Sequence, residues 1–236
     1  MIAKPPKAVR IGTLVILMAG ILVATGCGHY PSGITSLRDI NHTSPREYHI
    51  VLSSDVPLQD LRSLAKFKGL YEIDIDRGGT DEHLAALAGI GFTNLAEIVL
   101  TDSPGVTDKG LMSLVRIPTL IGLGLRGTSI DDAGCRLIAK QMKLQDINLP
   151  NCPQVTVSGL LALAQSETIQ DLGFSLNDLT QADLLKILRA AHGINHIEIA
   201  IGDEADRKLD LLDLRRIAEA KGIVLLGIRH NLATPL

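Results

Sequence analysis

A repeat with a period close to 25 residues organises most of this chain. The pattern apolar-x-x-apolar-x-apolar returns at spacings of 25, 25, 24, 25 and 25 residues, and then once more after 29. Its copies begin at Leu70, Leu95, Leu120, Leu144, Ile169, Ile194 and Ile223. A degenerate first copy lies at Ile50 and Leu52. Because a period of this length is the signature of stacked repeats, the sequence predicts an array of similar units.

Each period contains one strand pattern and one helix pattern. The alternation within the repeat predicts a short strand with one buried side. Apolar pairs three residues apart predict a helix, because residues i and i+3 share a helix face. These pairs are Leu58/Leu61, Leu84/Leu87, Leu111/Leu114, Cys135/Ile138, Leu160/Leu163, Leu184/Leu187 and Leu209/Leu212. No unit can bury its apolar side alone, so about eight units are expected to stack with a parallel sheet along one side.

The repeats resemble the leucine-rich-repeat family, particularly its cysteine-containing, ribonuclease-inhibitor-like type. The resemblance covers about residues 45 to 230, and is best in LRGTSIDDAG (125–134), LQDINLPNC (144–152) and VTDKGL (106–111). It implies a right-handed α/β solenoid over 46–236, with a parallel sheet on the concave face and helices on the convex face. It also implies protein binding in place of catalysis.

Two columns of the repeat are expected to have structural roles. Thr or Asp side chains that open helices accept hydrogen bonds from free backbone donors, which predicts helix N-caps at Thr80, Thr107, Asp131, Thr156 and Thr180. The column after each strand holds Gly78, Ser103, Thr128, Cys152, Asn177 and Gly202. In the family this column carries Asn or Cys that satisfies backbone groups, so the resemblance implies a structural Cys152. Cys135 replaces a helix-core leucine, and a structural role is expected there too.

The N-terminus predicts a secreted, lipid-anchored protein. Lys4, Lys7 and Arg10 precede an uncharged stretch of 18 residues from Ile11 to Gly28, which is the layout of a secretory signal. An uncleaved membrane anchor is the alternative, since this length is marginal for a bilayer. VATGC (23–27) resembles the bacterial lipobox, although Ala24 stands where Leu is commoner. The resemblance implies cleavage before Cys27 and acylation of Cys27. The signal would be 1–26 and an irregular polar tether 27–45.

The net charge of the chain limits the classes of partner that it can bind. Removing the signal takes three of the 23 basic residues and none of the 26 acidic ones, so the formal net charge moves from −3 to about −6. An acidic chain argues against nucleic acid, which normally requires a basic surface. By the lipoprotein sorting rule, Gly28 lacks the Asp that retains some lipoproteins at the inner membrane. We therefore expect an outer-membrane location in the cell envelope of a diderm bacterium.

Two motifs that suggest ligand chemistry fit the repeat better. Gly122–Gly127 spells GxGxxG, but Leu123 and Leu125 are repeat leucines, so the first two glycines are expected within a strand instead of a phosphate-binding turn. His192 and His196 have the spacing of metal ligands on a helix, but Gly193 and the start of a strand intervene. We predict no cofactor and no metal site at either place.

The outward side of the second strand is acidic. Glu72, Asp74 and Asp76 alternate with repeat isoleucines, and Glu97 is expected about 4.8 Å from Glu72 across the sheet. The simplest interpretation is a solvated acidic surface. The functional alternatives are a docking patch for a basic partner or a weak divalent-cation site. Arg126 is the clearest single anchor for a partner, since arginine is enriched in binding hot spots.

The sequence therefore predicts a non-catalytic protein-interaction or scaffolding lipoprotein. Its proposed partner-binding residues are Glu72, Asp74, Asp76, Glu97 and Arg126, and its lipid-attachment residue is Cys27. One alternative is an envelope lipoprotein that senses a cation or a small ligand. Another is a hydrolase or transferase that uses polar residues of the concave face.

Overall fold

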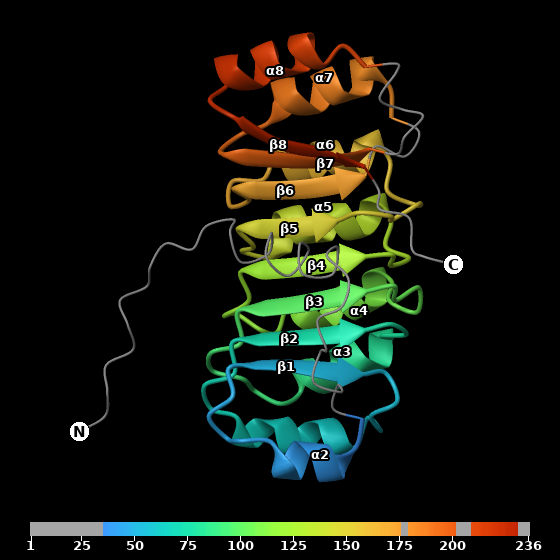
Figure 1. Cartoon of the computed structure of the whole chain (residues 1–236), viewed down its shortest axis with the longest axis vertical. Coiled ribbons are helices and arrows are strands. Elements are labelled where there is room, and N and C mark those ends of the chain that lie inside the picture. The colour runs from blue at the N-terminus through green and yellow to red at the C-terminus, as the bar shows by residue number, and fades with distance from the viewer. Residues whose placement is uncertain (1–34, 176–178, 202–208, 231–236) are drawn as a thin grey trace, which may run out of the picture. The chain divides into compact units, whose positions relative to one another are not determined.

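Eight strands form one parallel sheet in which each strand lies beside the next one in sequence (Figure 1). The computed structural model describes residues 35–175, 179–201 and 209–230. The strands are β1 His49–Ser53, β2 Glu72–Asp76, β3 Glu97–Thr101, β4 Gly122–Arg126, β5 Asp146–Leu149, β6 Asp171–Ser175, β7 His196–Ile201 and β8 Val224–His230. The sequential order means that every unit contacts only its neighbours, as expected for stacked repeats.

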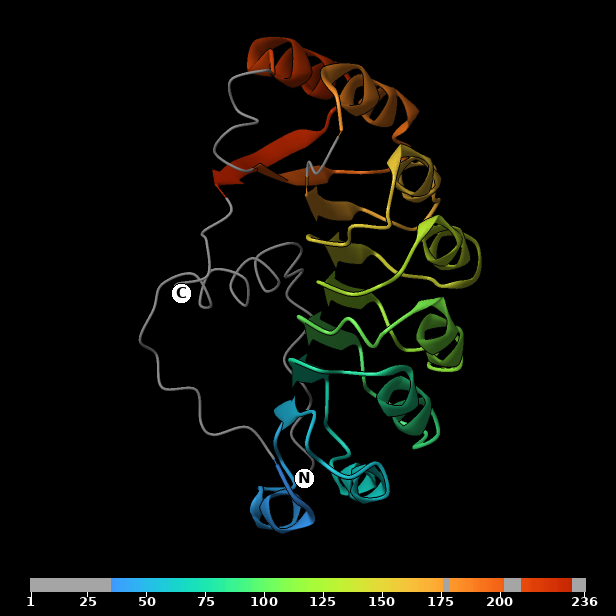
Figure 2. The same ribbon diagram turned by 90° about the vertical axis from the view of Figure 1, so that its right-hand side faces the viewer.

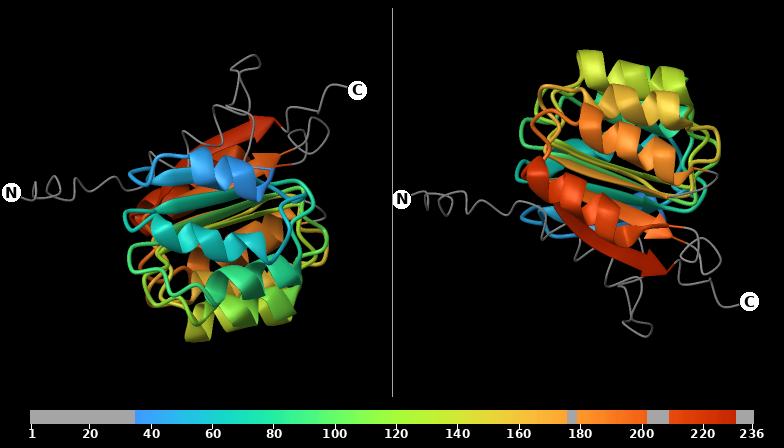
Figure 3. Two further views of the ribbon diagram at one scale, coloured as in Figure 1. Left: turned by 90° about the horizontal axis from the view of Figure 1, so that it is seen from below. Right: turned by 90° about the horizontal axis from the view of Figure 1, so that it is seen from above.

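One helix connects each strand to the next, and one further helix, α2, precedes the first strand. The helices are α2 Leu37–His42, the 3-10 helix η1 Asp60–Lys66, α3 Asp81–Ala88, α4 Asp108–Leu114, α5 Asp132–Gln141, α6 Val157–Ala164, α7 Gln181–Ala190 and α8 Leu211–Ala220. Helices α3 to α7 all lie on the same side of the sheet (Figures 2 and 3). We call the other side of the sheet the open face.

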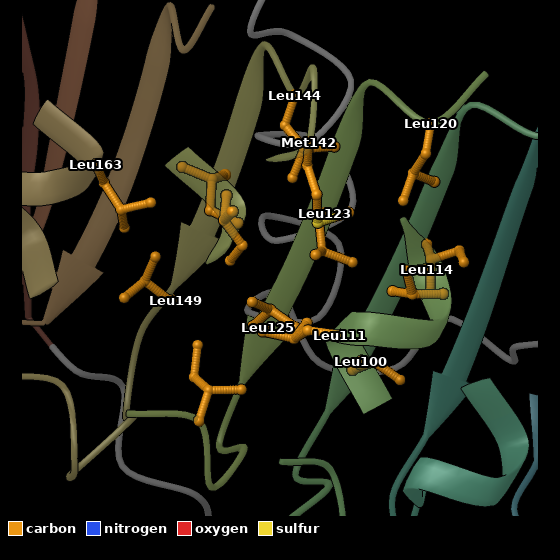
Figure 4. Packing of buried hydrophobic residues seen from close by; sticks show 14 of the residues in the cluster. Leu100, Leu111, Leu114, Leu120, Leu123, Leu125, Met142, Leu144, Leu149 and Leu163 are labelled. Carbon is orange, nitrogen blue, oxygen red and sulfur yellow. The ribbon is translucent and has the colours of Figure 1, made fainter. Parts of the chain in front are cut away.

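Aliphatic side chains fill the layer between the sheet and the helices. Ile73, Ile98 and Leu123 stand side by side in register on β2, β3 and β4, and all three are fully buried. Leu111 and Leu114 of α4 approach the strand leucines from the helix side (Figure 4). Burying each such side chain contributes roughly 1.5–3 kcal/mol before entropy is counted. The chain is an α/β solenoid of stacked strand-and-helix units, which confirms the predicted α/β fold.

A ladder of aspartates joins the helix N-termini. Asp81 accepts hydrogen bonds from the Thr107 backbone N at 2.8 Å, the Thr107 Oγ1 at 2.7 Å and the Gly110 backbone N at 3.0 Å. Asp132 binds Thr156 in the same way, at 2.8 and 2.7 Å. Asp108 accepts from the Asp131 backbone N at 3.2 Å. We call Asp81, Asp108 and Asp132 the helix ladder.

The helix ladder explains a column of glycines in the next helix. A Cβ atom at Gly110 would lie 2.5 Å from Asp81 Oδ1, and a Cβ at Gly159 would lie 2.5 Å from Asp132 Oδ1. A Cβ at Gly134 would collide with Asp108 Oδ1. The backbone of each helix therefore approaches the aspartate of the preceding unit so closely that only glycine fits.

The predicted caps and the predicted column after the strands are largely confirmed. All five predicted residues are N-caps, and four of them accept a backbone hydrogen bond: Thr107, Asp131, Thr156 and Thr180. The fifth, Thr80, makes no such bond. In the column after the strands, Ser103 Oγ accepts from Gly79 N and Cys152 Sγ donates to the Leu125 carbonyl oxygen. Cys152 and Cys135 are both buried, as expected for structural cysteines.

Three details of the predicted repeat are wrong. Leu58 is 40% exposed, and the buried pair of the first unit is Leu61 with Leu64. Leu212 is 78% exposed, and α8 buries Leu214 and Ala218 instead. In β8 a bulge shifts the register, so the partner of Ile197 is Leu225 and not the predicted Leu226.

The N-terminal predictions fall mostly outside the described residues. Cys27 and the signal segment 1–26 lie there, as do Asn177 and Gly202. The predicted irregular tether is wrong for residues 37–42, which form α2 and bury Ile40 completely. Among the helices that the structure describes, none combines the length and the apolar character needed to cross a bilayer.

Candidate functional site

The open face carries one row of polar side chains across most of the sheet. The pairing of the strands places the first residues of β1 to β7 side by side, in the order His49, Glu72, Glu97, Gly122, Asp146, Asp171 and His196. We call these seven residues the first row. Neighbouring strands lie about 4.8 Å apart, so neighbouring members of the row, such as Glu72 with Glu97 and Asp146 with Asp171, are held close together.

The carboxylates at one end of the first row have few hydrogen-bond donors. Glu72 and Glu97 are only 7% and 8% exposed. His49 Nε2 lies 3.1 Å from Asp74 Oδ2, and the Tyr71 hydroxyl donates to Glu97 Oε1 at 3.3 Å. Asp74 Oδ1 and Glu97 Oε2 are buried without a hydrogen-bond partner. A buried carboxylate oxygen without a donor is costly, so this end of the row favours a bound cation.

Burial and mutual repulsion raise the proton affinity of the row. Burial, followed by the charge of Asp74, raises the pKa of Glu72 to about 7. Burial also raises the pKa of Glu97. Burial, with the charges of Asp171, Glu97 and Glu198, raises the pKa of Asp146 to about 8. The hydrogen bond to Asp74 raises the pKa of His49. A cation placed over the row would lower these carboxyl pKa values and be stabilised in return.

The structure brings together three of the five predicted partner-binding residues. Glu72, Asp74 and Glu97 lie on adjacent strands, with Glu72 opposite Glu97 as predicted. Asp76 lies at the far end of β2 and is exposed. Arg126 lies at the end of β4, where its Nε is 3.9 Å from Asp102 Oδ1, too long for a hydrogen bond. Asp76 and Arg126 therefore stand apart from the first row.

Sequence reasoning did not select the other members of the row. His49, Asp146, Asp171 and His196 occupy the same column as Glu72, and this shared column was the signal that could have identified them. His196 Nδ1 lies 2.5 Å from Asp171 Oδ1. Polar residues in a repeat become informative when they are compared at equal positions along the period.

The two motifs set aside from the sequence are explained by the fold. Gly122 and Gly124 lie within β4, paired with Glu97 and Val99, and do not form a phosphate-binding turn. His192 is exposed before β7, and Gly193 at φ +72° separates it from His196. Over the described ranges, a single group of at least three residues has its potential ligand atoms within 4.8 Å of one another, namely His49, Glu72 and Asp74.

Comparison with known proteins gives little further information. No protein-family model matches the chain. Among solved structures, it is similar to an internalin from Listeria monocytogenes at 13% sequence identity and a TM-score of 0.39. The match covers 78% of this chain and 54% of the internalin chain, so the chain spans about half the length of that internalin. The assignment of the fold rests on the sheet register and the core described above.

Proposed function

We propose that this chain is a non-catalytic protein-interaction lipoprotein of the bacterial cell envelope, and that it binds a basic partner through its open face. The first row is the observation that supports this most. Glu72, Glu97, Asp146 and Asp171 stand in register from β2 to β6, and no lysine or arginine interrupts them. An extended surface of one charge suits recognition of the opposite charge.

The energetics of the row favour a cationic ligand. With Glu72 and Asp146 titrating at about 7 and about 8, the free protein reaches neutral pH with part of the row protonated. Lysine or arginine side chains of a partner would compensate the repulsion and displace those protons. Electrostatic complementarity of this kind acts mainly on association rate and specificity, and salt weakens it.

Binding is favoured over catalysis by the nature of the surface. Solenoids present extended faces that suit macromolecular partners, although a fold alone does not fix a function. A hydrolase or transferase that used a cysteine would need a reactive thiolate on the open face. The described cysteines, Cys135 and Cys152, are buried in the core, and burial raises the pKa of both thiols. Neither can serve as that nucleophile.

The membrane attachment rests on the N-terminal sequence. A basic region, an apolar stretch and VATGC (23–27) support acylation of Cys27 and, with Gly28 following, an outer-membrane location. Two or more acyl chains hold a protein durably on a bilayer. The variant Cys27→Ser is expected to remain unprocessed and unlipidated, as measured by the intact mass. A normal mature mass together with membrane retention in that variant would contradict the anchor.

A binding assay with neutralised variants tests the docking face. The probe is a fluorescent decalysine peptide, titrated into the protein in buffer containing a metal chelator. The double variant Glu97→Gln/Asp146→Asn should bind about tenfold more weakly than the wild type, which corresponds to roughly 1.4 kcal/mol. The matched control Glu167→Gln/Glu219→Gln removes two charges from exposed positions outside the open face. Equal affinity of the two double variants would refute the docking face.

A further inference from the structure

The start of the sheet contains an arrangement that basic docking does not explain. Glu72 and Asp74 lie two residues apart on β2, so their side chains leave the strand on the same side. His49 of β1 lies opposite Glu72 in the register. Strands β1 and β2 are neighbours in the sheet (Figure 1). Three potential metal ligands therefore converge from two adjacent strands.

We infer that His49, Glu72 and Asp74 form a binding site for a divalent transition-metal cation of the Zn²⁺ class. This inference goes beyond the proposed function and does not depend on it. The ligand atoms of the three side chains lie within 4.8 Å of one another. His49 Nε2 and Asp74 Oδ2 are 3.1 Å apart, close to the separation of about 3.4 Å between two ligands of a tetrahedral zinc ion.

Within this cluster, the deep burial of Glu72 and an unsatisfied oxygen of Asp74 point to a ligand. Glu72 is 93% buried, from its 7% exposure, and among the described residues no hydrogen bond or ion pair satisfies its carboxylate. Asp74 Oδ1 is also buried and has no hydrogen-bond partner. Buried polar atoms are nearly always satisfied in folded proteins. A cation between β1 and β2 would satisfy both carboxylates at once.

The types of ligand atom in the cluster determine which metal ions it favours. Imidazole nitrogen suits zinc, nickel, copper and iron, whereas calcium and magnesium prefer sites made entirely of oxygen ligands. One imidazole and two carboxylates therefore favour Zn²⁺ over Ca²⁺ and Mg²⁺. Three protein ligands leave at least one coordination position to water. Glu97 lies on the next strand, where its negative charge acts on His49 and attracts the cation further.

Calorimetric titration of the full chain with ZnCl₂, MnCl₂ and CaCl₂ at pH 7.5 tests the site. We expect one Zn²⁺ per chain, weaker binding of Mn²⁺ and the weakest binding of Ca²⁺. His49→Ala should weaken Zn²⁺ binding at least tenfold, and the near-isosteric Asp74→Asn should do the same. The matched control His192→Ala removes an exposed imidazole outside the cluster and should bind as the wild type does.

A second readout keeps the test decisive if His49→Ala fails to fold. Co²⁺ bound to the wild type should give visible absorption bands that Zn²⁺ abolishes, and Asp74→Asn should lack them. Absence of Zn²⁺ uptake by the wild type, or equal uptake by Asp74→Asn, would overturn the site. Because the decalysine assay contains a chelator, either result leaves the docking face to be judged by that assay alone.

Discussion

The helix ladder and the first row contain the same kind of side chain at the same repeat spacing, but their surroundings are opposite. In the helix ladder, Asp81 accepts three hydrogen bonds from the next unit. In the first row, Glu72 is more deeply buried than Asp81, yet no hydrogen bond within the described residues satisfies it. The helix-ladder carboxylates join the units together, whereas Glu72 and Asp146 are repelled by the carboxylates beside them.

This difference separates structural from functional carboxylates in the same molecule. Carboxylates that receive backbone donors stabilise the folded chain, because charge-assisted hydrogen bonds are strong. Carboxylates that lack donors lower its stability when they are ionised, and they remain available to a cation. Acidic residues of a repeat protein should therefore be judged by their donors and not by their number.

Loss of a helix-ladder aspartate should cause the largest loss of stability. Asp81→Ala removes three hydrogen bonds and leaves the Thr107 backbone N without its acceptor, so the free energy of unfolding should fall by about 3 kcal/mol. Urea denaturation measures this value. Glu167→Ala, at an exposed position, is the control and should leave the midpoint unchanged. A midpoint for Asp81→Ala equal to that of the control would remove the distinction drawn above.

Gly110, which lies against Asp81 of the helix ladder, gives a second test of the same comparison. Gly110→Ala places a Cβ atom 2.5 Å from Asp81 Oδ1, so we expect a loss of about 2 kcal/mol even though alanine favours helices. In the Asp81→Ala variant the carboxylate is absent, so Gly110→Ala should lower the free energy of unfolding by less than about 1 kcal/mol. A double-mutant cycle by urea denaturation measures the coupling. Additive effects would show that Gly110 is not required by Asp81.

An effect of the opposite sign is expected on the open face, where removal of a charge should stabilise the folded chain. The pKa of Asp146 is about 8 in the folded chain against an ordinary value of 3.8, so the folded state holds a proton that the unfolded state has released. The stability of the wild type should therefore fall as pH rises from about 4 to 8, and the full penalty should be present above pH 8. Asp146→Asn removes this penalty.

Thermal melting at pH 4 and pH 9 measures the effect. The variant Asp146→Asn should melt above the wild type at pH 9, and the difference should shrink towards pH 4. Asp131→Asn, at the exposed N-cap of α5, provides a contrast, because hydrogen bonds lower the pKa of Asp131. A lower melting temperature for Asp146→Asn than for the wild type at pH 9 would place Asp146 among the structural carboxylates.

The sequence predicted the strands well because their buried side chains repeat without interruption. The isoleucines and leucines from Ile73 to Ile199 define both the strand positions and the register, so the pairing of Glu72 with Glu97 followed directly. The buried side of each helix was harder to predict. Leu58, Leu61 and Leu64 share a spacing of three, which permits two choices of the buried pair. The exposure of Leu58 and Leu212 reflects this ambiguity.

The helix ladder and the full extent of the first row could not be predicted in the same way. Asp81 and Gly110 are 29 residues apart, and each is an ordinary residue near a helix start, so only packing reveals their contact. The raised pKa values of Glu72 and Asp146 depend on burial, which a residue type does not determine. His49 was overlooked because its strand carries the degenerate copy of the repeat.

An NMR titration of side-chain carboxyl carbons tests most directly whether the open face holds unsatisfied carboxylates. Asp183 provides an internal reference, since hydrogen bonds from Thr180, and then Lys186, lower its pKa to about 2. The structure predicts that Glu72 titrates at about 7 and Asp146 at about 8 in the same sample. Midpoints near 4 for both Glu72 and Asp146 would show that these carboxylates are ordinary solvated groups, and would contradict the account.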